Sequence, residues 1–224
     1  MNEPDTPATR LPVRPVIRLL WLLAVAAATL MLGVIGGLVW HHALDEPPRP
    51  LPETGSVDAG FAQDMTVHHA QAVDMSGAAL TLSTDPVVRS LAYDVLTTQQ
   101  AQIGTMQGWL TMWRLPAQST DGYMAWMPMT QMWHGAGTST MPGMATPAEL
   151  QRLRELSGPD FDGYYLQLLL RHHEGGLEMA RSAVDNASVR EVSALAERIV
   201  ATQSAEAAAI RDMLAAKGLA PLPG

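Results

Sequence analysis

The sequence contains no cysteine among its 224 residues. This absence excludes a disulfide framework, a thiolate metal site and catalysis by a thiol. Any folded domain in the chain must therefore be held together by its apolar core alone, which about 170 residues can provide.

Basic residues are also scarce. The chain has 14 Lys and Arg against 22 Asp and Glu, which gives a net charge of −8. Nucleic acids are bound through basic surfaces, so the sequence predicts no nucleic-acid partner. An acidic surface is compatible with the attraction of cations.

The usual signatures of catalysis are missing as well. A ferritin-like di-iron centre needs two Glu-x-x-His motifs, and none occurs in the sequence. There is no Gly-rich phosphate loop, and Ser76 and Ser182 have no adjacent His-Asp arrangement. We therefore expect a protein that is not an enzyme. A metal-dependent oxidase is the least favoured alternative, because no substrate pocket is evident in the sequence.

One long apolar run lies near the N-terminus. Residues 19–40 contain no charged side chain, and the run exceeds the roughly 20 residues that cross a bilayer core. The positive-inside rule places residues 1–18, with their three arginines, in the cytoplasm and the rest of the chain outside. The prediction is a single-pass transmembrane helix in the cell membrane. A cleaved signal peptide is the alternative, although its apolar region is usually about 7–15 residues long.

A Pro-rich spacer follows at residues 41–56 and is expected to be extended. Four amphipathic stretches then lie within residues 57–217, and residues 218–224 form a tail. Asp85-Pro86 is typical of a helix start and Gly218 of a helix stop. The helices are expected at residues 57–82, 84–113, 160–185 and 188–217.

A Met-rich loop, residues 114–147, separates the two pairs of helices. It contains Met124, Met127, Met129, Met132, Met141 and Met144, together with Trp126, Trp133 and His134. Two roles are open for it: capture of a soft metal ion, or a hydrophobic cover on the helices. Thr146-Pro147-Ala148-Glu149 predicts a further short helix to Leu156, because Thr and Glu at this spacing form a capping box.

Two His-His pairs, His68-His69 and His172-His173, lie in similar surroundings 104 residues apart. The same offset relates Asp58 to Asp162, Phe61 to Tyr165, Met75 to Met179, and Gln99 to Gln203. The matches extend across the turn between two helices, so the repeated unit is a helical hairpin. Two such hairpins predict an all-α fold, an antiparallel four-helix bundle with approximate twofold symmetry, in addition to the N-terminal helix.

Paired imidazoles beside thioethers favour a soft metal ion, because both ligands suit copper and thioethers favour its cuprous state. The predicted metal ligands are His68, His69, His172, His173, Met65, Met75 and Met179. Met141 and Met144 of the loop are further candidates. Neighbouring residues on a helix point about 100° apart, so we expect one imidazole of each pair at the metal and the other on a different face.

Zinc stays open as an alternative metal, since it binds His together with Asp or Glu, and so does the absence of any metal. Asp64 lies four residues before His68, and Glu178 follows the second pair. Gln99 and Gln203 either hydrogen-bond the histidines, which would orient them for a metal, or bridge helices in the core.

Three segments resemble the DUF305 family: Phe61-x-x-Asp64-Met65-x-x-His68-His69-x-x-Ala72-x-x-Met75, Arg171-His172-His173-Glu174-Gly175, and Met141-Pro142-Gly143-Met144. The resemblance covers roughly residues 56–216. It implies a ferritin-like four-helix bundle, and it implies copper binding, which some secreted members of that family show.

Two positions depart from the pattern of that family. Gln102 stands where the family more often has Glu, although Glu206 keeps the acid at the equivalent place of the second repeat. Leu169 stands where the first repeat has Met65. We therefore expect unequal occupancy of the two histidine pairs, with the first pair the better site for copper.

Two functional hypotheses follow. The first is a membrane-anchored, outward-facing protein that sequesters copper or hands it on, with the metal ion and the membrane as its partners. The second is a structural or partner-binding module of the cell envelope, in which the histidines are buried hydrogen-bonding groups.

Overall fold

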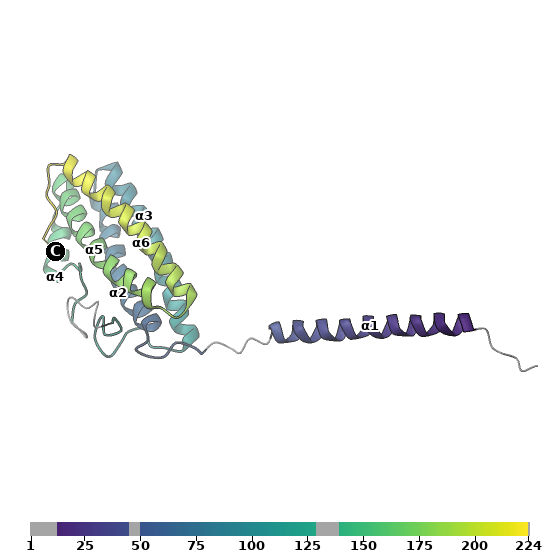
Figure 1. The fold of residues 1–224 in the computed structure, drawn as a ribbon. Helices are drawn as coiled ribbons and strands as arrows, with labels where there is room; N and C mark the ends of the chain where they lie inside the picture. Colours follow the sequence, from purple (N-terminus) through teal and green to yellow (C-terminus); the bar gives the residue numbers. More distant parts are fainter. Residues whose placement is uncertain (1–12, 45–49, 129–138, 224) are drawn as a thin grey trace, which may run out of the picture. The chain divides into compact units, whose positions relative to one another are not determined.

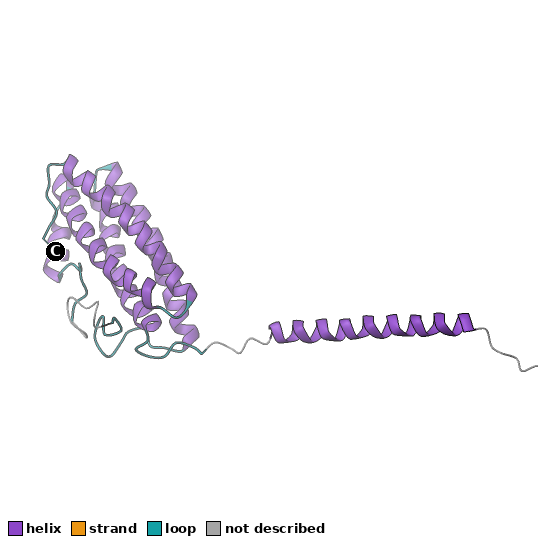
Figure 2. Ribbon diagram, in the orientation of Figure 1, coloured by secondary structure: helices purple, strands orange, loops and turns teal. Residues whose placement is uncertain are grey.

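The computed structural model describes residues 13–44, 50–128 and 139–223. Within these ranges the regular structure is helical (Figures 1 and 2). The chain divides into two compact units, residues 1–50 and 51–224, and each is described by itself. Outside the described residues lie most of the segment predicted to be cytoplasmic, residues 45–49 of the predicted spacer, and residues 129–138 of the Met-rich loop, which include Met129, Met132, Trp133 and His134.

The first unit contains one helix, α1 (Val13–Leu44). Within it, Pro15–His42 has a mean hydropathy of 2.4 and no buried residue, and it is long and apolar enough to cross a membrane. A signal sequence near an N-terminus shares these features. The apolar run at residues 19–40 lies inside α1, and His41 and His42 lie in the last turn.

The second unit is a four-helix bundle, which confirms the predicted all-α fold. Its long helices are α2 (Val57–Leu82), α3 (Pro86–Trp113), α5 (Gly158–Asn186) and α6 (Arg190–Ala216), and the short α4 is Pro147–Glu155. Helix α2 packs on α3, α5 packs on α6, and the two hairpins meet along α2 and α5. All five helices begin and end within two residues of the expected positions.

Side-chain caps explain several of these helix ends. Ser56 and Asp85 each accept a hydrogen bond from a backbone N–H in the first turn of α2 and α3. Pro86 follows Asp85 at a position where its missing N–H removes no helical hydrogen bond. Thr146 and Glu149 form the predicted capping box at the start of α4.

Helices α2 and α5 cross in antiparallel directions. The His172 imidazole Nε2 lies 2.9 Å from the His68 carbonyl oxygen, at the middle of both helices. Further along α2, the Ser76 hydroxyl lies 2.9 Å from the hydroxyl of Tyr165, which precedes His172 on α5. Later residues of one helix thus meet earlier residues of the other.

The core of the bundle falls into two apolar clusters of different composition. One, here called the aliphatic half, contains Met75 with Leu169, Phe161 and Tyr165. The other, called the thioether half, contains six buried methionines: Met65, Met106, Met124, Met127, Met141 and Met179. Because α2 and α5 are antiparallel, Met65 and Met179 share one half although they occupy different positions in the two sequence repeats.

Candidate metal centre

The four predicted histidines are all fully buried at the crossing of α2 and α5. The imidazole rings of His68 and His172 lie with centroids 3.8 Å apart and planes inclined by 36°. The centroids of His172 and His173 are 6.3 Å apart. His69 and His173 are hydrogen-bonded to residues of α3 and α6 instead. The two members of each pair do diverge, and imidazoles of both pairs lie together in one cluster.

Each histidine uses its Nε2 atom to bond an oxygen. The four contacts are His68 to Pro142 O at 3.2 Å, His69 to Gln102 Oε1 at 2.7 Å, His172 to His68 O at 2.9 Å, and His173 to Glu206 Oε2 at 2.6 Å. Carbonyl, amide and carboxylate oxygens only accept hydrogen bonds. The Nε2 atoms therefore carry the proton and donate it.

The opposite ring nitrogen is left as a free lone pair in all four residues. The Nδ1 atoms of His68, His69, His172 and His173 are buried and have no hydrogen-bond partner. A ring N–H fixed by an oxygen is the arrangement by which proteins orient the other ring nitrogen toward a metal. Among the described residues, no three His, Asp or Glu side chains are placed to hold one ion together. A site made of three such side chains is therefore not preformed.

Burial keeps three of the four imidazoles, those of His68, His69 and His172, uncharged. It lowers the pKa of His68 to about 4, although the bond to Pro142 opposes the change. It lowers the pKa of His69 to about 3 and that of His172 well below its usual value, and the neighbouring imidazoles add to both shifts. The neutral imidazole is the form that binds metal, so no proton has to leave these three rings at neutral pH.

The predicted methionine ligands do not all lie together. Met65, Met179 and Met141 are buried in the thioether half, and Met144 packs against it from a partly buried position. Met75 lies in the aliphatic half with Leu169. The core thus has a sulfur-rich half and a sulfur-poor half, and unequal metal occupancy of the two histidine pairs stays a prediction.

The sequence did not lead us to the residues that hydrogen-bond His69 and His173. Gln102 bonds His69 and Glu206 bonds His173, whereas both amide groups of Gln99 and Gln203 are buried without a hydrogen-bond partner. The two observed contacts are related by the same 104-residue offset as the histidines. That offset, applied to the polar residues of α3 and α6, was the signal that could have found them.

Asp64 anchors the Met-rich loop. Its Oδ2 accepts hydrogen bonds from the Met124 backbone N–H at 2.7 Å and the Trp126 indole N–H at 2.8 Å. Burial raises the pKa of this carboxyl, and the two hydrogen bonds oppose the rise. Trp126 also packs edge-on against Phe61. One carboxylate considered for zinc is thus engaged by the loop, while the other, Glu178, is half-buried on α5.

Replacement of Asp64 by Asn is expected to destabilise the protein by about 1–2 kcal/mol, because the Asn N–H₂ group would either stand unpaired at the place of Oδ1, which is buried without a hydrogen-bond partner, or replace the acceptor Oδ2. Chemical denaturation measures the change. Asp74→Asn is the matched control, since the Asp74–Arg154 ion pair is about half exposed and such pairs contribute about 0–1 kcal/mol. Equal effects of the two substitutions would contradict the role given to Asp64.

The segment Met141–Ala145 lies directly over the histidines. The amide of Gln71 on α2 exchanges two hydrogen bonds with the backbone of Ala145, at 2.6 and 2.9 Å. Gly143 has a φ of +75° and packs so closely on α5 that a Cβ atom would lie 2.4 Å from the Arg171 carbonyl oxygen. A Cβ atom on Gly175 would lie 2.2 Å from the Pro142 carbonyl oxygen. The close approach of two backbones positions the oxygen that accepts from His68.

We expect Gly175→Ala to displace this segment, because the clash is with backbone atoms that no rotamer change can move. The expected loss is about 1–3 kcal/mol of unfolding free energy, as for other overpacked sites. Gly108→Ala is the matched control. It lies inside α3 with nothing within 4 Å of its would-be Cβ, and it should stabilise the protein by about 0.5–1 kcal/mol. Thermal or chemical unfolding of both variants tests whether the unfolding free energy falls in Gly175→Ala and rises in Gly108→Ala.

An ion pair ties α4 to the same stretch of α5. The Arg171 guanidinium donates two hydrogen bonds to the Glu149 carboxylate, at 2.9 and 2.7 Å. This contact lowers the pKa of Glu149 to about 2, although partial burial opposes the change. Glu149 also completes the cap of α4, so the residue before His172 is held from outside the bundle.

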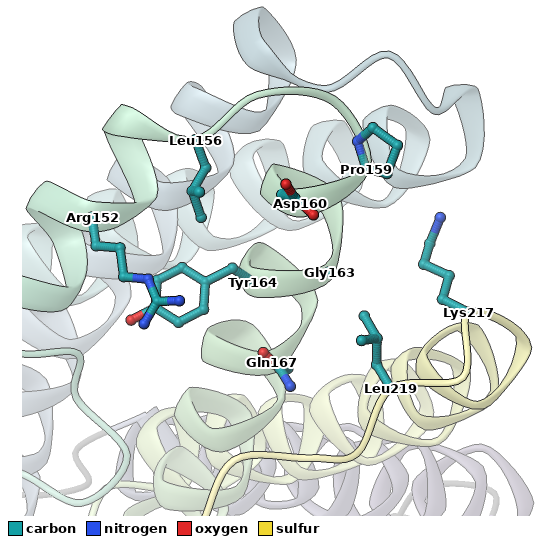
Figure 3. Close-up of a pocket in the computed structure, with 9 residues that line it drawn as sticks. All are labelled: Arg152, Leu156, Pro159, Asp160, Gly163, Tyr164, Gln167, Lys217 and Leu219. Carbon is teal, nitrogen blue, oxygen red and sulfur yellow. The ribbon is translucent and has the colours of Figure 1, made fainter.

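An open hollow on the bundle is separate from the histidines. It has a volume of about 660 Å³ and lies between the start of α5 and the end of α6 (Figure 3). Arg152 lies over the ring of Tyr164 in this hollow, 4.7 Å from its centroid. None of the predicted site residues lines it. A buried metal site is formed by converging ligands rather than by open space, so we place the candidate centre at the helix crossing.

Comparison with known proteins gives a family. The profile of a family described as a domain of unknown function (DUF305) matches residues 58–214. The crystal structure of a DUF305 protein from Streptomyces coelicolor is 43% identical, with a TM-score of 0.69, over 76% of this chain and 99% of that one. A DUF305 fragment from Deinococcus radiodurans is 31% identical, with a TM-score of 0.60, over 73% and 99%.

A second group of similar structures carries metal. CopM in its Cu(II)-bound form is 25% identical, with a TM-score of 0.55, over 70% of this chain and 94% of that one. CopM is also solved in a Cu(I)-bound form, which is 23% identical with a TM-score of 0.55. Among proteins of curated function, none matches this chain.

Proposed function

The chain belongs to the DUF305 family, and on that premise we propose that it binds copper in the cuprous state, to sequester the ion or to hand it on. The role is binding rather than catalysis. Copper is the cargo of the protein, and the ligands are expected at the crossing of α2 and α5. CopM, a structural neighbour, is known in copper-bound and silver-bound forms, which supports the proposal.

One observation carries the proposal. Four buried histidines each donate Nε2–H to a fixed oxygen and keep a buried Nδ1 lone pair without a partner. A purely structural histidine gains stability from bonding both ring nitrogens, since an unpaired buried polar atom costs about 1–3 kcal/mol. Four such atoms in one cluster are explained by a ligand that accepts their lone pairs.

The core composition supports a soft monovalent ion over zinc. Thioethers bind Cu(I) well, whereas zinc prefers imidazole with carboxylate or thiolate. Met65, Met141 and Met179 lie in the thioether half of the core. Asp64 is engaged by the loop, and Glu206 bonds an imidazole instead of standing free as a ligand.

We further propose that α1 anchors the protein in the cell membrane with the bundle outside the cytoplasm. The length and hydropathy of α1 and the arginines that precede its apolar run support this orientation. Fractionation of cells that express the full chain tests it. The expected result is intact chain in the membrane fraction, with the bundle open to protease added from outside. A soluble chain that has lost α1 would show a cleaved signal peptide instead.

Competition titration tests the choice of metal. The full chain in detergent is titrated with Cu(I), Ag(I) and Zn(II), each buffered by a chelator of known affinity. We expect Cu(I) and Ag(I) to bind at least about tenfold more tightly than Zn(II). Equal or tighter binding of Zn(II) would contradict a soft-metal centre.

The second candidate function is a structural module of the cell envelope. It is favoured by the fact that every Nε2 atom already has a partner and by the lack of a preformed group of three ligands among the described residues. Thermal unfolding separates the two functions. A ligand at a hundred times its Kd stabilises a folded protein by about 2.7 kcal/mol, so Cu(I) or Ag(I) should raise the melting temperature. No metal would raise it if the histidines were only structural.

A further inference from the structure

A narrow polar seam runs between α3 and α6, on the side of the bundle away from α4. Helices α3 and α6 lie side by side there (Figure 1), and the side chains between them leave no space as wide as a water molecule. Three pairs of polar residues, each related by the 104-residue offset, line it with Ile199: Thr98 and Thr202, Gln99 and Gln203, Gln102 and Glu206.

The inner end of the seam reaches the histidines. Gln102 and Glu206 are the residues that bond His69 and His173. Deeper still, a Cβ atom on Gly176 would lie 2.7 Å from the Gln203 amide oxygen and 3.4 Å from His68 Nδ1. The amide oxygen and the free lone pair of His68 therefore border the same small space.

The buried glutamines of the seam are the unusual part. Gln99 is 3% exposed and Gln203 is 2% exposed, yet neither the nitrogen nor the oxygen of either amide has a protein partner. Buried polar groups are almost always hydrogen-bonded. Two of these four unpaired atoms are amide oxygens, which can coordinate a cation in transit.

The other sides of the histidine cluster offer fewer polar groups between the imidazoles and the surface. The segment Met141–Ala145 covers it across α2 and α5, held by Gln71 and by the close contact of Gly143 with α5. The two ends of the bundle are closed by the aliphatic half and the thioether half. The seam is thus the side where the surface and the imidazoles are connected by polar groups.

Resting on the proposed function, we propose that this seam is the route by which the metal ion enters and leaves the histidine cluster. The amide oxygens of Gln99 and Gln203 replace water around the ion one contact at a time, while the Glu206 carboxylate stays bonded to His173 and lies beside the path. Hard oxygen ligands hold a soft ion weakly, and passage requires sites that bind weakly enough to release the ion. The carboxylate also favours a cation over an anion.

The test separates rates from affinity. Thr98, which is exposed, and Thr202, which is half-buried, lie at the outer end, so Thr98→Phe and Thr202→Phe should obstruct the seam without removing a ligand. Their matched controls are the neighbouring positions, Thr97→Phe and Ala201→Phe, which are exposed and do not line it. Transfer of Ag(I) from a chromophoric chelator to the full chain in detergent is followed by the absorbance of the chelator.

We expect at least tenfold slower uptake and release of Ag(I) in one or both seam variants, with the affinity unchanged, and control variants equal to the unmodified chain. Unchanged rates in both seam variants, with normal affinity, would overturn the seam and leave the proposed function standing. A chain that takes up no Ag(I) in its unmodified form would overturn both. The two failures are therefore distinguishable.

Discussion

Replacement of the four buried histidines by Gln is expected to lower the affinity of the full chain for Cu(I) and Ag(I) by at least about a hundredfold. Changes in the groups that only orient metal-bound histidines already lower affinity 10–100-fold, and this variant removes the imidazole ligands themselves. A Gln amide N–H₂ stands close to the place of the imidazole Nε2–H, so the bonds to Pro142, Gln102, His68 and Glu206 can be kept. The variant carries His68→Gln, His69→Gln, His172→Gln and His173→Gln.

The matched control is the pair of histidines in α1, His41 and His42. Their replacement by Gln makes the same chemical change outside the bundle and should leave the affinity unchanged. Circular dichroism reports whether each variant keeps its helices. A folded fourfold variant that binds Cu(I) as tightly as the unmodified chain would refute the assignment of the ligands.

A marked loss of stability between pH 7 and pH 5 is the second large effect we expect. The pKa of His68 is lowered to about 4 and that of His69 to about 3 by burial, from about 6.5 in an unfolded chain. Below pH 6.5 the unfolded chain therefore binds protons that the folded chain does not, and the unfolding free energy falls with pH. At pH 5 each residue accounts for a loss of about 2 kcal/mol, and the loss continues toward the folded-state values.

Other groups do not produce this change. The pKa of Glu149 is lowered from 4.5 to about 2, so its contribution to stability is complete above pH 4.5 and is lost only below that range. The raised pKa of Asp64 acts in the opposite direction, because protonation of its folded form favours the folded state as the pH falls. Urea unfolding at pH 7, 6 and 5 measures how steeply the unfolding free energy falls with pH. The fourfold Gln variant should show little of this fall, and equal slopes in the two proteins would contradict neutral buried imidazoles.

Local chemistry was sufficient to predict the fold. The cap of Asp85 before Pro86 and the capping box of Thr146 and Glu149 depend on a few neighbouring residues, and both appear where the sequence indicated. The 104-residue offset between the histidine pairs pointed to two hairpins, and the bundle is built from two. Periodicity and caps act over short distances, so a single sequence carries them.

The candidate site was predictable only in part, because its contacts join residues far apart in the chain. The oxygen that accepts from His68 belongs to Pro142, 74 residues away, and no spacing rule connects them. Met75 is seven residues after His68 and so lies on the same face of α2, yet the antiparallel crossing places it in the aliphatic half. How far one helix is shifted along its axis relative to a partner depends on the contacts between the two helices. Spacing within one helix does not specify those contacts.

Gln102 and Glu206 show how a sequence signal can be present and still be missed. They form an unequal pair at the 104-residue offset, whereas Gln99 and Gln203 are an identical pair, which suggested them as hydrogen-bond partners of the histidines. The structure gives the histidine contacts to the unequal pair. A carboxylate behind His173 makes its ring a stronger donor of electron density than an amide behind His69, so the two pairs are not equivalent.

The central claim is that the free Nδ1 atoms of the four buried histidines are the atoms that take the metal. Nitrogen-15 NMR of the full chain, labelled at its imidazoles and recorded before and after addition of Ag(I), tests it most directly. We expect four histidines in the Nε2–H form, whose Nδ1 signals shift when silver binds while their Nε2–H signals persist. Silver-dependent shifts at Nε2, or shifts confined to His41 and His42, would contradict it.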